Sequence, residues 1–569
     1  MAGNNRHARR SGKARHRRPA SPLLRPADRA QALLAAGRLG EAFDAFCLAA
    51  AATPPDLAAR AAFGAFLIAN VPGRPHPDID AVFAAALDQA WLRPDALAPA
   101  AIRCLENGAG ALIGAEPDLA APDVQALLVH PVLLALLRAT PAATPRLEIF
   151  LARVRHAALV AGAGAGGVPL ALLIALAEHA DASGFALTLP ARDAARLAAE
   201  AEKLPGLRAR AVGGHVHSVA LLGCHESLQA LPESLWAAPA LGPVLAAHVT
   251  APKRAASIAA SLTPITPIDA SSAPVATQYE ADPYPMWVRE PVGLPVALPP
   301  VVARRADPRR VRRVLVAGCG TGQHALVAAD RWPRASLLAI DLSRASLAHA
   351  IAKTDALGIN RIRFALGDLL AVETLDERFA VIEAVGVLHH LADPTAGLKA
   401  LAQALAPGRV MLVALYSRRA RAGLAAARAL ADGAPESPAA IRAWRARSTN
   451  WTRPKSSTRP ISTASAGVAI WCSTSARQAM TCPRSARWRQ RRACRCSRSS
   501  RRRAPSPIPP SRPIWSAGMR VSRPNRCCSA ACIMSGLQPI NDAPHHSKRT
   551  RKSIEGTSRC IDLGAEIRG

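Results

Sequence analysis

Aromatic residues and cysteines are scarce in most of this chain. Aromatic side chains make up 4% of the 569 residues although half of the residues are hydrophobic, so we expect cores of alanine, leucine and valine. Four cysteines precede residue 437, namely Cys47, Cys104, Cys224 and Cys319. Their scattered positions argue against a disulfide framework and indicate buried thiols in a reducing compartment, so we expect a cytoplasmic protein.

Acidic residues are absent from residues 437–541, and this absence shapes the charge of the whole chain. The net charge of +32 would by itself suggest a nucleic-acid partner. The first 18 residues hold seven Lys and Arg and no acid, and residues 437–569 hold 27 Lys and Arg against four acids. Residues 19–436 therefore carry only +2, and we expect no nucleic-acid partner for this body of the chain.

The tail, residues 447–569, has neither helical nor strand periodicity. It is rich in Arg, Ser and Pro, yet it also contains Trp and Cys, which disordered basic tails normally lack. We interpret it as a low-complexity basic tail produced by a frameshift near residue 447. A genuine Arg- and Ser-rich RNA-binding tail is the alternative. Its cysteine spacings do not match zinc sites, and we predict no metal site in the chain.

The amino-terminal arm, residues 1–25, is basic and lacks the apolar run of a secretory signal, so we expect it to be disordered. Residues 157–177 contain no charge and are long enough to cross a bilayer. Glycines and a proline interrupt the middle of this stretch. We therefore predict two buried helix ends joined by a loop, and no membrane partner, with a membrane span as the alternative.

Residues 26–250 show helical periodicity throughout and predict an all-helical domain without a catalytic constellation. Residues 30–54 resemble one tetratricopeptide repeat, in which two helices meet at a small-residue turn and a proline ends the second. A plain helical hairpin explains the same pattern. If the resemblance holds, this domain recruits a substrate or a protein partner.

Residues 251–310 are rich in Pro, Ser and Ala and predict a linker. Within it, residues 278–287 concentrate two of the three tyrosines of the chain, Tyr279 and Tyr284, together with Trp287. This segment either covers a binding pocket, with Tyr284 as a candidate catalytic residue, or anchors the linker to the next domain.

The most informative stretch is residues 314–322, with the sequence VLVAGCGTG. It predicts a buried strand, a glycine turn and then a helix, because glycine permits positive φ and close approach of a ligand. A second strand ends on Asp341, 19 residues beyond Gly322, where a carboxylate can bind a ribose diol. The glycine spacing is not the G-x-G-x-x-G of dinucleotide-binding proteins.

Three further strands are predicted at residues 362–366, 379–384 and 410–416, with helices between them. Residues 311–446 therefore predict a Rossmann-like, doubly wound parallel sheet of the α/β class. Asp368 follows the third strand. Both Asp341 and Asp368 have an alternative interpretation as ordinary helix caps.

This pattern resembles the class I S-adenosylmethionine-dependent methyltransferases. The resemblance implies S-adenosyl-L-methionine as cofactor, with the methionine part at the glycine turn, the ribose at Asp341 and the adenine at Asp368. It implies cofactor contacts from Ala317, Gly318, Cys319, Gly320, Thr321, Gly322, Asp341, Leu342, Gly367, Asp368, Leu369 and Glu383. It also implies a β-hairpin after the fifth strand, which the tail does not supply.

The candidate catalytic residues are His389, His390, Glu383 and Tyr284, none of which the pattern assigns firmly. The three at the end of the fourth strand are expected to face the substrate crevice, where either histidine could accept a proton. Both histidines have an alternative role in packing the turn. The predicted function is methyl transfer to a small-molecule or protein acceptor. The alternative is an inactive helical-repeat interaction protein that keeps a cofactor-binding fold.

Overall fold

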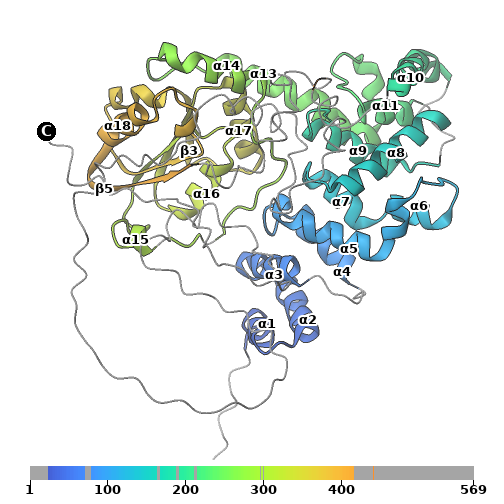
Figure 1. Ribbon diagram of the computed structural model, residues 1–569, viewed down its shortest axis with the longest axis horizontal. Coiled ribbons are helices and arrows are strands. Elements are labelled where there is room, and N and C mark those ends of the chain that lie inside the picture. The colour runs from blue at the N-terminus through green and yellow to red at the C-terminus, as the bar shows by residue number, and fades with distance from the viewer. Residues whose placement is uncertain are drawn as a thin grey trace, which may run out of the picture.

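The computed structural model describes residues 24–415, apart from 71–77, 163–166, 187–190, 211–214, 295 and 299, and also residue 440. A helical part is followed in sequence by an α/β part, and the two lie beside each other (Figure 1). This arrangement confirms the predicted fold class. The predicted tail and the position of the missing hairpin lie outside the described residues, as does nearly all of the amino-terminal arm.

The helical part begins with a hairpin of α1 (Pro26–Ala35) and α2 (Leu39–Ala50), joined by a turn in which Gly37 has φ +73°. The hairpin is the feature that resembled a tetratricopeptide repeat, and that finer assignment stays a prediction. The following helices are α3 (Leu57–Ala69), α4 (Ile79–Asp88), α5 (Pro94–Gly114), α6 (Pro122–Leu128), α7 (Pro131–Ala139), α8 (Pro145–Ala161), α9 (Leu170–Ala182), α10 (Ala191–Arg210), α11 (Val216–Gly223) and α12 (Gly242–Leu245).

Four of the nine phenylalanines gather where α2 packs on α3. The rings of Phe46 and Phe63 stack with centroids 5.2 Å apart, and Phe43 meets Phe63 edge-on at 5.3 Å. Trp91 closes the cluster. Nearly half of the phenylalanines are therefore gathered at one packing site, while the remaining core of the helical part is Ala- and Leu-rich, as the composition predicted.

Residues 122–139 form two helices, α6 and α7, and not one continuous helix. Pro131 begins α7 and has no N–H to continue the hydrogen bonds of α6, so the chain turns at Val129 and His130. Residues 122–139 form the one stretch of the described chain long and apolar enough to cross a membrane, with half of it buried in the structure. The break makes it a pair of packed helices. Residues 157–177 contain the predicted helix ends, of α8 and α9.

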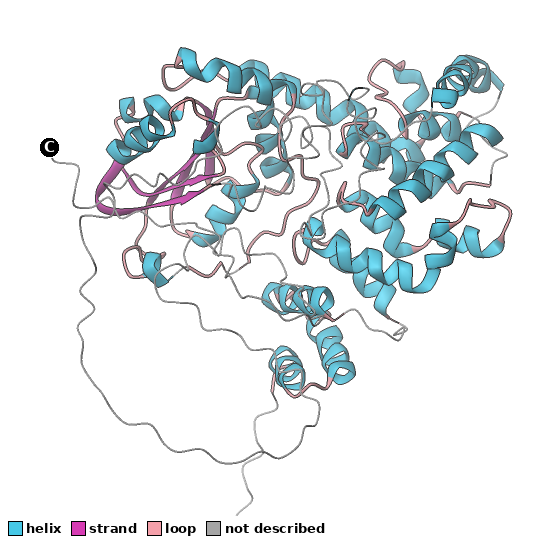
Figure 2. Ribbon diagram, viewed as in Figure 1, coloured by secondary structure: helices cyan, strands magenta, loops and turns pink. Residues whose placement is uncertain are grey.

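The strands form one sheet (magenta in Figure 2). It is fully parallel, with strand order β3-β2-β1-β4-β5. Its strands are β1 (Arg313–Ala317), β2 (Ser336–Asp341), β3 (Ile362–Leu366), β4 (Phe379–Val385) and β5 (Leu405–Ala414). The first four match the predicted ranges within a residue or so. β5 begins earlier than expected, because Leu405 already pairs with Phe379 at the start of β4; regular pairing resumes at Val410, opposite Val381, after an irregularity in the register.

Helices cover both faces of this sheet. Alternate strand residues such as Val316 and Leu315 point to opposite faces, so each face has an apolar core of its own. One core includes α16 (Gln323–Arg331) and α17 (Arg344–Ala356), and the other includes α18 (Pro394–Ala404). The crossover from β1 to β2 through α16 places the glycine turn at the carboxyl edge of the sheet.

Residues 251–310, expected to be a linker, contain α13 (Ala251–Ser261), α14 (Ala273–Ala281) and the short α15 (Pro300–Ala303). Both α13 and α14 pack against α17 (Figure 1). Between them, Ile265 N–H donates to the Leu366 carbonyl at 2.8 Å, just beyond the end of β3. The proline-rich composition therefore concealed a segment that folds onto the α/β part and reaches the carboxyl edge of its sheet.

Candidate functional site

The glycine turn joins β1 to α16, and all three of its glycines have positive φ: +66° at Gly318, +53° at Gly320 and +85° at Gly322. A Cβ on Gly318 would lie 2.3 Å from Val387 Cγ2, and one on Gly322 would lie 2.7 Å from Ala350 Cβ. Two of the glycines are thus required by packing as well as by the turn. The third, Gly320, faces residues 279–290, which lie over the turn.

Asp341 ends β2 beside this turn, as its spacing predicted. Its Oδ2 accepts a hydrogen bond from Gly320 N–H at 2.7 Å, and its Oδ1 accepts one from Ser343 N–H at 3.0 Å. Burial raises the pKa of Asp341, although these backbone donors oppose the rise. A carboxylate has about four acceptor positions, so Asp341 can accept a ligand hydroxyl in addition to its backbone donors. Leu342 follows it, half-buried.

Asp368 is fully buried after β3, and backbone groups satisfy its carboxylate. Leu370 N–H donates to Oδ1 at 2.9 Å and Asp269 N–H donates to Oδ2 at 3.0 Å. The first bond caps a short 3₁₀ helix, which is the ordinary role that the sequence allowed as an alternative. The second ties the carboxylate to the segment between α13 and α14. An adenine ring would have to share or replace this second bond.

The remaining predicted cofactor positions line the same edge. Ala317 ends β1 fully buried, and Thr321 and Leu369 are also buried. Gly367 N–H donates to the Asp341 carbonyl at 3.0 Å, which holds the ends of β2 and β3 together. Burial raises the pKa of the Cys319 thiol well above its usual value, so this cysteine stays protonated. The structure thus brings the glycine turn and the ends of β2 and β3 together.

Glu383 does not face the crevice, which corrects the expectation from sequence. Its side chain lies inside the fold under α16 with no exposed surface, and four hydrogen bonds hold it. Its Oε1 accepts from Arg331 Nη1 and Trp332 Nε1, both at 2.7 Å. Its Oε2 accepts from Arg331 Nη1 at 2.6 Å and His324 Nε2 at 2.7 Å. Burial opposes ionisation, but the charges and hydrogen bonds of Arg331 and His324 together outweigh it and lower the pKa of Glu383 to about 2.

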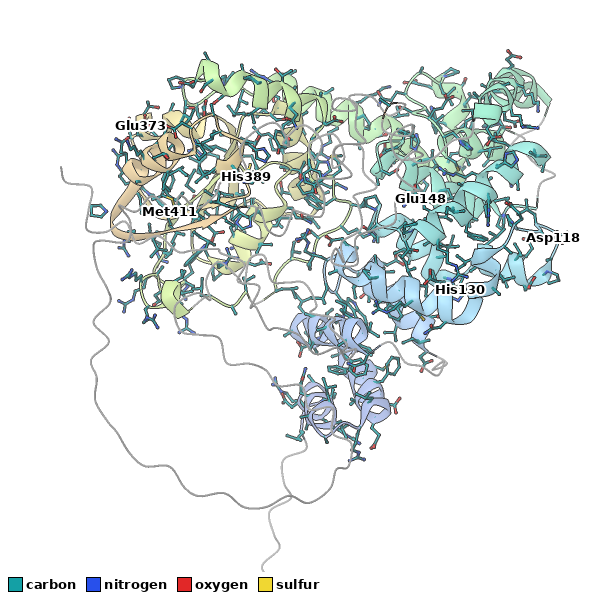
Figure 3. All side chains as sticks on the ribbon, in the orientation of Figure 1. Asp118, His130, Glu148, Glu373, His389 and Met411 are labelled. Atoms are coloured by element: carbon teal, nitrogen blue, oxygen red, sulfur yellow. The ribbon has the colours of Figure 1, made fainter. Side chains whose placement is uncertain are left out.

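His389 and His390 lie on a 3₁₀ turn (Leu388–His390) after β4, and Figure 3 labels His389 inside the α/β part. Both are buried, with ring centroids 4.2 Å apart. His390 Nε2 lies 3.1 Å from the hydroxyl of Tyr279, whose ring meets the imidazole edge-on. This contact joins α14 to the end of β4. The sequence drew attention to Tyr279 but did not predict its contact with His390.

Residues 279–290 run over the glycine turn. Thr321 Oγ1 donates to the Pro285 carbonyl, and Trp287 Nε1 donates to the Thr321 carbonyl at 2.9 Å. The Tyr284 carbonyl lies 3.1 Å from where a Cβ on Gly320 would be. Trp287 is buried, so it acts as the anchor that the sequence offered as one alternative. Tyr284 is half-buried above the turn.

Glu280 in the same segment reaches the turn after β2. Its Oε2 accepts hydrogen bonds from Ser343 Oγ and from Ala345 N–H, both at 3.1 Å. Its charge is one cause of the raised pKa of Asp341. Two carboxylates therefore approach the carboxyl end of β2, and a hydroxyl-bearing ligand that donates hydrogen bonds would relieve their repulsion.

The helical part reaches the start of α16. Arg93, at the beginning of α5, donates to Gln323 Oε1 at 2.7 Å and lies 3.7 Å from Glu290 Oε1. Gln323 Nε2 donates to Glu290 Oε2 at 2.6 Å. Gln323 directly follows Gly322, so this contact between the parts adjoins the glycine turn. Sequence periodicity carries no signal for it, because 230 residues separate Arg93 from Gln323.

Comparison with known proteins finds similarity to a known family within the α/β part. Residues 314–408 match the model of a family described as "Methyltransferase domain". An uncharacterized protein of Synechococcus sp. is 43% identical over 111 residues, which are 19% of this chain and 27% of that protein. The chain therefore matches about a quarter of the length of this relative.

Solved structures align with a similarly short part of the chain. One is a structure titled "Conversion of a Disulfide Bond into a Thioacetal Group during Echinomycin Biosynthesis". It is 28% identical with a TM-score of 0.22, and the alignment covers 29% of this chain and 66% of that chain. Another is phosphoethanolamine N-methyltransferase 2 of Haemonchus contortus in complex with S-adenosyl-L-methionine, with 22% identity, TM-score 0.18, and coverage of 20% and 26%. TM-scores this low carry no argument about function. The family match to residues 314–408 is what identifies the segment containing the glycine turn, Asp341 and Asp368 as similar to methyltransferase domains.

Proposed function

We propose that this chain is an S-adenosyl-L-methionine-dependent methyltransferase. The observation that carries the proposal is the bond from Gly320 N–H to Asp341, which closes a positive-φ glycine turn against the end of β2 inside the segment matched to methyltransferase domains. Such a turn presents backbone to a ligand, and the adjacent carboxylate accepts from a diol. Both features fit a nucleoside that lacks a pyrophosphate.

A Cβ on Gly386, directly after β4, would meet nothing within 4 Å, so there is open space beside this residue at the carboxyl edge of the sheet. We assign the methionine part to residues 317–322, the ribose to Asp341 and Leu342, and the adenine to residues 367–369. For the adenine, the segment that now bonds Asp368 must move or share its bond.

Bound S-adenosyl-L-methionine would supply a methyl group on a sulfonium, which a nucleophile takes by in-line displacement. The protein then has to orient the acceptor, exclude water and receive a proton where the acceptor carries one. We assign proton acceptance to His390, because its Nε2 already engages the Tyr279 hydroxyl at 3.1 Å beside the end of β4. Residues 279–290 exclude water from the turn.

A non-catalytic interaction protein is the second candidate function, and one observation favours it. The Asp368 carboxylate is fully buried and bonds two backbone N–H groups, so the segment between α13 and α14 already bonds the group assigned to the adenine. In this case the helical part would be the functional surface, and the α/β part would be a scaffold. The two candidates differ in whether the chain binds a cofactor.

Titration calorimetry of the full chain with S-adenosylhomocysteine separates them. For a methyltransferase we expect binding, and we expect Asp341→Asn to weaken it at least tenfold, about 1.4 kcal/mol, through lost hydrogen bonds to the ribose. Asp307→Asn is the matched control, because Asp307 is exposed before β1 and should leave binding unchanged. Equal binding by wild type and Asp341→Asn would contradict the assignment of the site.

A further inference from the structure

The amino edge of the sheet, opposite the glycine turn, carries arginine at every strand. Arg312 and Arg313 stand at the start of β1, Arg334 precedes β2, and Arg361 and Arg363 stand at the start of β3. Arg378 directly precedes β4, and Arg409 precedes the residues of β5 that pair with the middle of β4. We call this set the arginine edge: Arg312, Arg313, Arg334, Arg361, Arg363, Arg378 and Arg409.

Sheet order places these residues in a row. Since β3, β2, β1, β4 and β5 are neighbours in that order, arginines far apart in the sequence become adjacent along one edge. Six of the seven are exposed, and Arg361 is half-buried. At a strand spacing of about 4.8 Å, five strands extend the row over roughly 19 Å. The segment leading into β1 adds exposed arginines at 304, 305, 309 and 310.

Ion pairs balance part of this charge. Arg310 lies 3.6 Å from Asp307, Arg361 lies 3.3 Å from Asp330, and Arg363 lies 3.3 Å from Glu377. The last of these pairs is open to solvent and contributes little, so it leaves the field of the edge largely positive. A shallow depression of about 630 Å³ opens between the starts of β2 and β3, lined in part by Arg334, Ser336, Asn360, Arg361 and Arg363. It offers guanidinium, hydroxyl and amide groups together.

We propose that the arginine edge binds the sugar–phosphate backbone of a nucleic acid, independently of base sequence. Guanidinium groups bind phosphate bidentately, and every cation in the row is arginine. The roughly 19 Å row spans about six phosphates of one duplex strand, at about 3.4 Å each. This proposal reverses the expectation drawn from the average charge of residues 19–436, because the fold gathers charge that the average hides.

The observations favour nucleic acid over a membrane surface. A helix or edge that binds anionic lipid combines cations with apolar side chains that enter the interface. Of the exposed large hydrophobic side chains in the described part of the chain, only Leu357 lies in a segment leading into one of these strands. The arginine edge and the glycine turn lie at opposite ends of the strands, about 17 Å apart, which is the length of five strand residues. Nucleic acid bound at the arginine edge would therefore anchor the protein without entering the cofactor site.

Fluorescence anisotropy of the full chain with a labelled duplex DNA tests the proposal between about 50 and 200 mM salt, the range over which phosphate contacts change affinity strongly. Each phosphate contact contributes about 0.9 to the magnitude of the slope of log affinity against log salt. Replacing Arg312, Arg334 and Arg363 by Gln removes three such contacts and should therefore reduce this magnitude by about 2.7. The control replaces Arg29, Arg38 and Arg196, exposed in the helical part, with the same loss of charge. We expect its slope to change by less than one.

The control variant separates the contribution of the arginine edge to binding from that of the basic ends of the chain, because every variant retains those ends. Equal slopes for the two triple variants would overturn the proposal. A second readout gives position: bound duplex or single-stranded RNA should protect Arg312, Arg334 and Arg363 from phenylglyoxal, mapped by mass spectrometry. Protection elsewhere only would also overturn it. So would edge-dependent binding to phosphatidylserine vesicles or polyglutamate that equals or exceeds binding to the duplex.

Discussion

At the residue scale, Glu383 shows what a buried carboxylate requires. Arg331, Trp332 and His324 supply its four hydrogen bonds, and Arg331 is itself almost fully buried. The ion pair between Glu383 and Arg331 fixes α16 against β4, directly behind the glycine turn. A buried charge stays favourable only while its partner and its hydrogen bonds are in place.

Replacing Glu383 by Gln should therefore destabilise the fold by about 3–5 kcal/mol, because it removes the carboxylate charge that faces the buried Arg331 guanidinium. Urea unfolding followed by circular dichroism measures this loss. Glu377→Gln is the control, since Glu377 pairs with an exposed arginine and its loss should cost less than about 1 kcal/mol. If the two substitutions cost the same, the Glu383 cluster does not stabilise α16 as described.

The sequence predicted the position of Asp341 but not the surroundings of Glu383. Asp341 follows from local rules, because a buried strand after a glycine turn must end at the same edge. The partners of Glu383 come from residues 51 to 59 positions away on α16. Which face of β4 they meet depends on strand order, and single-sequence patterns do not determine that order.

At the element scale, the turn between β1 and α16 depends on glycine for two separable reasons. Gly318 needs positive φ, and it needs the space that Val387 occupies. Gly358, after α17, has nearly the same φ of +68° but nothing within 4 Å of an added Cβ. The two glycines form a natural pair for separating backbone strain from steric overlap.

Gly358→Ala should cost about 1 kcal/mol of stability, from backbone strain alone. Gly318→Ala should cost clearly more, because the new Cβ overlaps Val387 at 2.3 Å. Adding Val387→Ala to Gly318→Ala should recover part of the excess. Denaturant unfolding of the four proteins measures these differences. An equal cost for both single substitutions would show that the turn does not pack against Val387.

The strands were predictable and the segment over the turn was not. β1 to β4 are short apolar runs between turn residues, which local patterns identify. Residues 251–310 have the composition of a linker, yet α13 and α14 fold onto α17. Their packing against α17 depends on the α/β part being present, and prolines at the first turns of both helices start them rather than break them.

At the scale of the whole molecule, the helical part and the α/β part meet through polar groups. Arg93, Glu290 and Gln323 form one contact, and Arg289 lies 3.6 Å from Asp88 in another. Burial raises the pKa of Glu290 to about 7 despite the nearby charge of Arg93. The contact beside the glycine turn is therefore sensitive to pH in the neutral range.

The sign of this effect follows from proton binding. Glu290 binds a proton below about pH 7 in the folded chain but only below about pH 4.5 when unfolded, so its contribution to stability grows as pH falls through that window. From pH 8 to 5.5, wild type should gain about 2 kcal/mol relative to Glu290→Gln. Urea unfolding at the two pH values measures the difference, with the exposed Glu116→Gln as control. No differential gain would contradict the buried position of Glu290.

The central claim is that S-adenosylhomocysteine binds at the turn between β1 and α16, against Asp341. Hydrogen exchange of the full chain with and without this ligand tests it most directly. The account predicts added protection at the backbone amides of residues 318–322 and 341–343, lost in Asp341→Asn. Protection confined to other segments, or none at a ligand concentration that saturates known methyltransferases, would contradict it.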